Sequence, residues 1–175
     1  MKTTLKFGLI TGAISVVWLF GSFTLFTWLS GKYGWDIQVS TIRGIGGLLS
    51  IPIQAIGIYM AMQNIKQISG SLTYGRAVKT GLVVAVTIAT VVAIFSLLYC
   101  TVINPGYAEF MVHDAQKTMI AKGESQQDIS QASVAVRNEF SAGMQVMQAL
   151  VGQFVTGTIM SLIIGLFIKT KKKSA

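Results

Sequence analysis

Charged residues are scarce in this chain of 175 residues, at 11% of the total against about 25% in a typical soluble domain. Hydrophobic residues make up 52% of the chain. A soluble protein of this composition would expose extensive apolar surface and would aggregate. The scarcity of charge therefore excludes an ordinary soluble fold and indicates a membrane protein.

Acidic residues are scarcer still, at 6 against 14 lysines and arginines, which gives a net charge of +8. A basic balance of this size can indicate nucleic-acid binding. The basic residues here flank apolar segments, however, and form no stripe on a soluble face. We therefore expect the basic residues to contact the lipid bilayer, and we expect no nucleic-acid partner.

The chain also lacks the residue patterns of common enzymes. It contains no HExxH, P-loop or dinucleotide fingerprint, and no Ser-His-Asp set is visible. The single cysteine, Cys100, lies in an apolar segment and permits no intramolecular disulfide. The single histidine, His113, follows Glu109 by one helical turn, but two ligands do not make a metal site. We predict no catalytic residue, cofactor or metal, although Glu109, His113 and Glu139 could still meet in space.

What the chain does have is four long apolar segments, at about residues 7–29, 44–63, 80–103 and 147–168. Each holds about 20 residues or more, enough for a helix to cross the roughly 30 Å hydrocarbon layer. Backbone groups in lipid must be satisfied internally, so we expect helices. The first segment is too long for a signal-peptide core and lacks a cleavage site after it. The sequence predicts an all-α, four-helix transmembrane bundle over residues 1–175 as a single membrane domain.

The remaining charges are sorted between the two sides of these segments. One side holds nine basic residues and no acid: Lys2, Lys6, Lys66, Arg76, Lys79, Lys169, Lys171, Lys172 and Lys173. The other side holds all six acids with Lys32, Arg43, Lys117, Lys122 and Arg137. The positive-inside rule then predicts cytoplasmic N- and C-termini in a bacterial inner membrane. Five aromatic residues should lie at the outer interface: Trp28, Tyr33, Trp35, Tyr99 and Tyr107.

The outer segment at about residues 105–146 is the one stretch that looks soluble. Pro105 ends the third span, and a helix is expected from 107 to 121. Gly123 breaks that helix, and Ser125 with Asp128 forms a capping pattern. Apolar residues then recur at helical spacing with no strong breaker, which favours one rod of about 40 residues into the fourth span. The two outer segments should pair as a helical hairpin.

Two amides and several small residues interrupt the apolar spans. Gln54 and Gln153 are predicted either to bond between helices or to line a cavity. Small residues recur every fourth position in the third span and around Ser161 in the fourth. Such ridges let backbones approach closely, within one bundle or between the subunits of a homo-oligomer. The spans carry no ionisable residue, which disfavours proton-coupled or ion-coupled transport.

Two stretches carry a resemblance to a known family. They are Lys6-Phe7-Gly8-Leu9-Ile10-Thr11-Gly12-Ala13 and Leu72-Thr73-Tyr74-Gly75-Arg76-Ala77-Val78-Lys79-Thr80-Gly81. With the proline break, the acidic outer helix and the lysine tail, the chain resembles the domain of unknown function 4199 family. The resemblance implies a small integral inner-membrane protein of the kind known chiefly from Bacteroidetes. It implies no activity and no catalytic residue, because the family has none assigned.

Two functional hypotheses follow. The first is a non-enzymatic accessory, assembly or sensing subunit that works through contacts with lipid or with a membrane or periplasmic protein. Its partner surface would be the outer residues Glu109, His113, Asp114 and Glu139. The second is a small uncoupled transporter or channel, with a path lined by Gln54, Gln153 and span hydroxyls such as Thr87 and Thr90.

Overall fold

A computed structural model describes residues 2–33 and 39–170, and all regular structure in these residues is helical. The helices are α1 (Lys2–Tyr33), α2 (Val39–Ser69), α3 (Tyr74–Leu98), α4 (Tyr107–Ala121), α5 (Gln126–Glu139) and α6 (Ala142–Ile168), with a π-helical turn at Tyr99–Ile103. Trp35, Asp36 and the lysines at 171–173, which entered the orientation argument, lie outside the described residues.

Four of the described helices are long and apolar enough to cross a membrane: α1, α2, α6, and α3 with its π-helical turn. This confirms the all-α, four-span prediction. Each helix is longer than the apolar segment that predicted it. In particular, α2 begins at Val39 rather than near Gly44, so that Arg43 belongs to its first turns.

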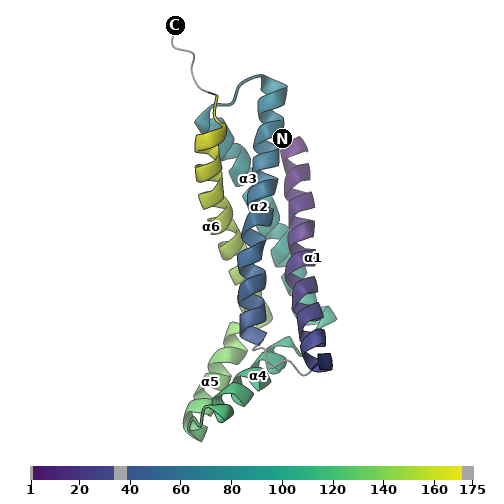
Figure 1. Cartoon of the computed structure of the whole chain (residues 1–175), viewed down its shortest axis with the longest axis vertical. Helices are drawn as coiled ribbons and strands as arrows, with labels where there is room; N and C mark the ends of the chain where they lie inside the picture. Colours follow the sequence, from purple (N-terminus) through teal and green to yellow (C-terminus); the bar gives the residue numbers. More distant parts are fainter. Residues whose placement is uncertain (1, 34–38, 171–175) are drawn as a thin grey trace.

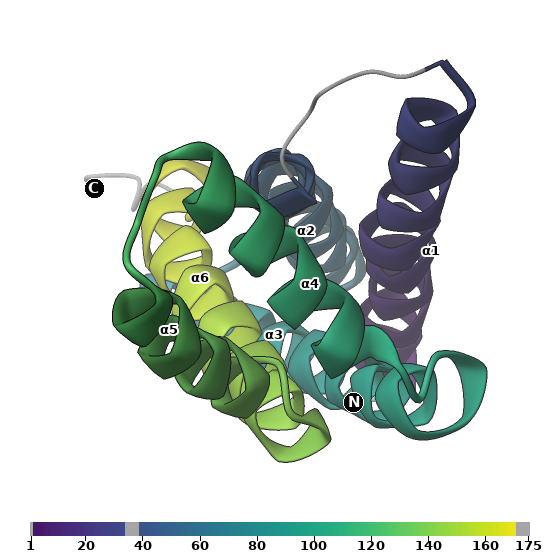
Figure 2. The same cartoon turned by 90° about the horizontal axis from the view of Figure 1, so that it is seen from below.

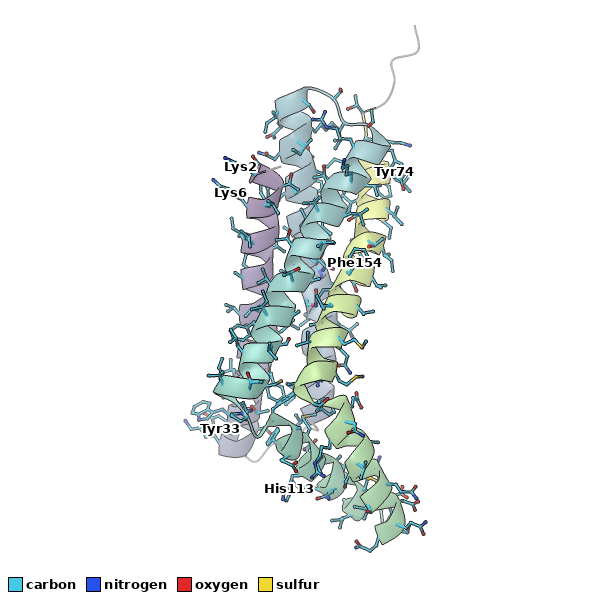
Figure 3. All side chains as sticks on the ribbon, turned by 180° about the vertical axis from the view of Figure 1, so that it is seen from behind. Lys2, Lys6, Tyr33, Tyr74, His113 and Phe154 are labelled. Carbon is cyan, nitrogen blue, oxygen red and sulfur yellow. The ribbon has the colours of Figure 1, made fainter. Side chains whose placement is uncertain are left out.

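The four long helices form an elongated bundle in which α3 packs against α1, α2 and α6 (Figure 1). One end of the bundle holds the start of α1 and the end of α6, and we term it the terminal end. The opposite end carries α4 and α5, and we term it the hairpin end. Lys2 and Lys6 lie at the terminal end, whereas Tyr33 and His113 lie at the other (Figure 3).

Local signals account for the hairpin. The π-helical turn closes with a bond from Asn104 N to Tyr99 O of 2.7 Å, directly before Pro105. Gly123 adopts φ +75°, a left-handed conformation that favours glycine and lets α4 turn into α5. Ser125 Oγ then accepts from Asp128 N at 3.2 Å and caps α5. From below, α4 lies across the end of the bundle (Figure 2), and α5 packs beside α4 beyond the end of α6 (Figure 1).

The expected continuous rod from Ser125 into the fourth span is wrong. Helix α5 ends at Glu139, and α6 begins at Ala142 after Ser141 adopts an extended backbone with φ −61° and ψ 150°. The ring of Phe140 packs 5.9 Å from that of Tyr107 and 4.6 Å from the guanidinium of Arg43. The local sequence holds no strong breaker at this point, so tertiary packing of Phe140 accounts for the bend.

The small-residue ridges of α3 and α6 face each other inside this one chain. A Cβ atom added at Gly157 would lie 2.5 Å from Ala85 Cβ, and one at Gly81 would collide with the side chain of Ser161. The two backbones therefore touch along this seam, which is the close approach that small residues permit. The seam uses the ridges for packing within the chain.

Candidate functional site

A chamber of about 250 Å³ opens at the hairpin end of the bundle. Residues of five helices, α1, α2, α3, α4 and α6, line it together with Tyr99 of the π-helical turn, so six elements position its walls. Its apolar wall comes mainly from Leu19, Phe20, Phe23, Ile42 and Val92. Its polar wall comes from Arg43, Ser96, Tyr107 and three glutamines, Gln145, Gln148 and Gln153. Two chamber residues without side chains, Gly46 and Gly47, belong to α2.

Arg43 organises the polar wall. Its Nη1 donates to Tyr107 Oη at 3.0 Å, and its Nη2 donates to Gln145 Oε1 at 2.7 Å and to Gln148 Oε1 at 3.3 Å. The amide of Gln145 in turn donates to the carbonyl of Glu139 at 3.0 Å. This network joins α2 to α4 and to both sides of the bend between α5 and α6.

Tyr107 connects the same wall to an aromatic cluster. Its ring lies 5.6 Å from those of Phe23 and Tyr99, in edge-to-face contacts. Tyr99 and Tyr107 are 7% and 6% exposed, so they pack inside the molecule rather than at the lipid interface where we expected them. Burial raises the pKa of Tyr107 to about 12, although the nearby charge of Arg43 lowers it. The phenol therefore remains protonated near neutral pH.

Gln54 and Gln153 meet at the inner edge of the chamber. Gln54 Nε2 donates to the backbone carbonyl of Gln153 at 3.0 Å and to its Oε1 at 3.1 Å. Gln54 is 1% exposed, and its own Oε1 has no partner among the described residues. Gln153 also lines the chamber, so this residue bonds between helices and faces the cavity at once.

Ser161 lies deeper, outside the chamber lining. Its hydroxyl donates to the Gly157 carbonyl of its own helix at 2.6 Å, and the residue is fully buried against Gly81. Its place is in the seam between α3 and α6. The structure thus assigns Ser161 a different environment from Gln54 and Gln153.

The four candidate outer residues separate into three situations. Arg137 donates to both carboxylate oxygens of Glu109, at 2.7 and 2.8 Å, and this bond lowers the pKa of Glu109. Burial raises the pKa of Asp114, while the backbone N–H of Val39 at the start of α2 lowers it. His113 and Glu139 are exposed. Within the described residues, no three His, Cys, Asp or Glu side chains are grouped so that they could hold a metal ion.

A known protein family matches the chain over most of its length. The family of proteins of unknown function DUF4199 matches residues 6–170. The chain belongs to that family. No curated protein and no solved structure matches this DUF4199 protein.

Four residues of the polar wall escaped sequence reasoning in this DUF4199 protein: Arg43, Ser96, Gln145 and Gln148. Arg43 was counted only as a topological charge, because it precedes the apolar segment. The stretch from Val39 to Arg43 contains neither glycine nor proline, and this absence of helix breakers is compatible with a helix that includes Arg43. Gln145 and Gln148 are three residues apart and therefore share a helical face, which was a second signal.

Proposed function

We propose that this protein is a non-enzymatic accessory, assembly or sensing subunit of a bacterial inner membrane. In this proposal both termini are cytoplasmic and the hairpin is periplasmic. The charge distribution supports this orientation, because the described cations of the terminal end occur without acids. The described acids all lie in or beside α4 and α5.

The observation that carries the proposal is the double attachment of the hairpin to α2. The Asp114 carboxylate of α4 interacts with the backbone N–H of Val39 at the start of α2, and Arg43 Nη1 of α2 donates to Tyr107 Oη at the start of α4. A partner that displaces α4 would disturb both contacts. The hairpin is therefore mechanically coupled to a helix that runs the length of the bundle (Figure 1).

The free surface of the hairpin supplies the contacts for such a partner. His113 and Glu139 are exposed, and no described residue engages the His113 ring or the Glu139 carboxylate. Exposed polar groups on a projecting element suit a partner that is recognised in water. Glu109 and Asp114 serve the same surface indirectly, because they hold α5 and α2 against α4.

The test is crosslinking in native membranes followed by detergent pull-down. We expect a reproducible partner whose recovery falls when His113→Ala and Glu139→Ala are combined. Arg76→Gln, which changes an exposed residue at the terminal end, should leave recovery unchanged. Recovery that is insensitive to the hairpin variant, or a strictly monomeric protein without any partner, would contradict the proposal.

The alternative is an uncoupled transporter or channel. The chamber beside Gln153 supports it, but Gln54 and Gln153 bond to each other at its inner edge. Beyond that pair, the seam at Gly157 and Ala85 leaves no room for an added Cβ. Flux into liposomes that contain folded protein, above that of empty vesicles, would favour the alternative over contact-based function.

A further inference from the structure

The chamber holds a positive charge without a matching carboxylate. Among the described lining residues, Arg43 is the only charged one. Its hydrogen-bond partners are a phenol and two amides, all neutral. The carboxylate–guanidinium pair that the described residues do form, Glu109 with Arg137, lies on the hairpin. A partly buried arginine that has no carboxylate partner is suited to binding an anionic ligand.

The neighbouring groups favour an anion for a second reason. Gln148 and Gln153 use their amide oxygens to accept bonds from Arg43 and Gln54. No described residue accepts a hydrogen bond from the amide N–H groups of Gln148 or Gln153, so these groups can donate to a ligand. The Tyr107 oxygen accepts from Arg43, so its own proton is available to a ligand. The polar wall therefore presents donors, and a donor-rich wall recognises oxygen anions.

The depth of Arg43 indicates the source of that anion. Arg43 and Lys66 lie near opposite ends of α2, 23 positions apart. At 1.5 Å per residue this is about 35 Å of helix, slightly more than the roughly 30 Å of hydrocarbon. Lys66 Nζ caps the Ile168 carbonyl at 2.9 Å at the terminal end. Arg43 consequently lies at the level of the phosphate groups of the opposite leaflet.

An apolar groove adjoins the chamber. It lies between α1 and α3, has a volume of about 520 Å³, and is lined mainly by Leu25, Trp28, Phe95 and Ile103. Phe20 and Tyr99 line both the groove and the chamber. The Phe20 and Tyr99 rings, whose centroids lie 4.8 Å apart, stand between the two cavities, so the groove lies across these rings from the chamber and its apolar lining suits an acyl chain.

We propose that the chamber binds the phosphate of an anionic membrane lipid, with Arg43 as its cationic anchor. The proposal deepens the proposed function, on which it rests, by naming the class of ligand for the contact site. The guanidinium and the Tyr107 hydroxyl bind phosphate oxygens, and the amide groups of Gln148 and Gln153 complete the donor set. The acyl chain occupies the groove beside Phe20.

The test titrates the purified full-length protein, in a neutral detergent, with dihexanoyl phosphatidic acid. We expect saturable binding that weakens at least about tenfold in Arg43→Gln, because a charge-assisted contact is lost. Lys122→Gln removes an exposed charge at the same end and should change binding by less than about twofold. Arg43→Lys keeps the charge but loses the fork geometry, so its affinity should be intermediate.

A second pair of variants tests the chamber without changing Arg43, so that misfolding of the arginine variants would not leave the proposal untested. A Cβ at Gly47 would meet nothing within 4 Å, and Gly47 lines the chamber, so Gly47→Leu should fill it without a clash in the backbone. Gly44 is equally open and lies outside the lining, so Gly44→Leu is the matched control. We expect loss of lipid binding in the first and retention in the second, with equal helicity.

Two further probes separate the sources of the anion. Inorganic phosphate and neutral dihexanoyl glycerol should each bind at least about tenfold more weakly than the lipid that combines them. Phosphate that binds as tightly as the lipid would overturn the lipid assignment in favour of a free anion. Equal weakening by Arg43→Gln and Lys122→Gln, or no saturable binding by folded protein, would overturn the site itself.

These outcomes are independent of the partner test. Lipid binding that fails while capture still depends on His113 and Glu139 removes the lipid site and leaves the accessory function. Capture that fails while Arg43-dependent lipid binding persists removes the accessory function and leaves a lipid-binding membrane protein.

Discussion

The two halves of the bundle are packed in different ways. In the terminal half, a Cβ added at Gly8, Gly57, Gly81 or Gly157 would collide with a neighbouring helix. In the hairpin half, a Cβ added at Gly21, Gly44 or Gly152 would meet nothing within 4 Å because these residues are exposed on the outside of the bundle, and Gly47, which is equally free, borders the chamber. These four glycines of the terminal half therefore lie at helix contacts, whereas those named in the hairpin half face outward or border the chamber.

Span hydroxyls bond backbone carbonyls in both halves, as Ser161 does for Gly157 O at 2.6 Å and Ser96 does for Val92 O at 2.9 Å. The hairpin half has in addition a network in which Arg43 bonds other side chains, at distances of 2.7 to 3.3 Å, around the chamber. The terminal half is thus held by a close-packed seam, whereas the hairpin half encloses a chamber lined by a polar network.

The largest effect should come from breaking the close-packed seam. Gly157→Leu inserts a side chain against Ala85 and should lower the free energy of unfolding by about 3 kcal/mol, since overpacking forces the backbones apart. Gly152→Leu, at an exposed position of the same helix, should cause no loss. Unfolding in mixed micelles, followed by circular dichroism, measures both. Equal losses in the two variants would mean that the seam at Gly157 is not close-packed.

A smaller effect is expected from releasing the hairpin. Asp114→Ala removes the acceptor for Val39 N and should cost about 1 kcal/mol, as the loss of a helix N-cap does. Hydrogen exchange should accelerate in the first turn of α2 while remaining slow around Gly157. Glu124→Ala changes an exposed acid of the same hairpin and serves as the control. Acceleration at Gly157 as well would show that the two halves open together.

The smallest effect concerns the exposed ion pair of the hairpin. Arg137 lowers the pKa of Glu109 from its usual value of 4.5, so the pair contributes stability above that value. This contribution is lost as the pH falls through the lowered pKa, because Glu109 becomes protonated. In Arg137→Gln the pKa should return toward 4.5, which NMR titration of Glu109 would measure. An unchanged pKa would show that the bidentate contact does not persist in solution.

Sequence reasoning was most successful where the signal is local. Residues 107–121, marked by Pro105 and Gly123, are the residues of α4, and Ser125 caps α5 as its spacing with Asp128 indicated. Sequence reasoning was least successful where the local conformation depends on contacts with residues that are distant in the sequence. Phe140 ends α5 through contacts with Tyr107 and Arg43, and the one local mark of the bend is Ser141, a residue type that favours helix N-caps.

The candidate site shows the same limit. Gln54 and Gln153 stood out as amides in apolar spans, and the structure brings them together at 3.1 Å. Arg43 did not stand out, because a cation at the edge of a span is ordinary in a membrane protein. Only its contact with Gln145, 102 positions further along the chain, distinguishes it from a topological charge.

The sequence by itself determined the four membrane-spanning helices and the bounds of α4, because hydropathy and turn chemistry act over a few neighbouring residues. The tertiary structure decided which small residues touch, where the rod bends and which way Arg43 faces. These features depend on side chains from different helices that meet only after the bundle has formed. The chamber at the hairpin end belongs to this second class, since five helices and the π-helical turn must assemble before it exists.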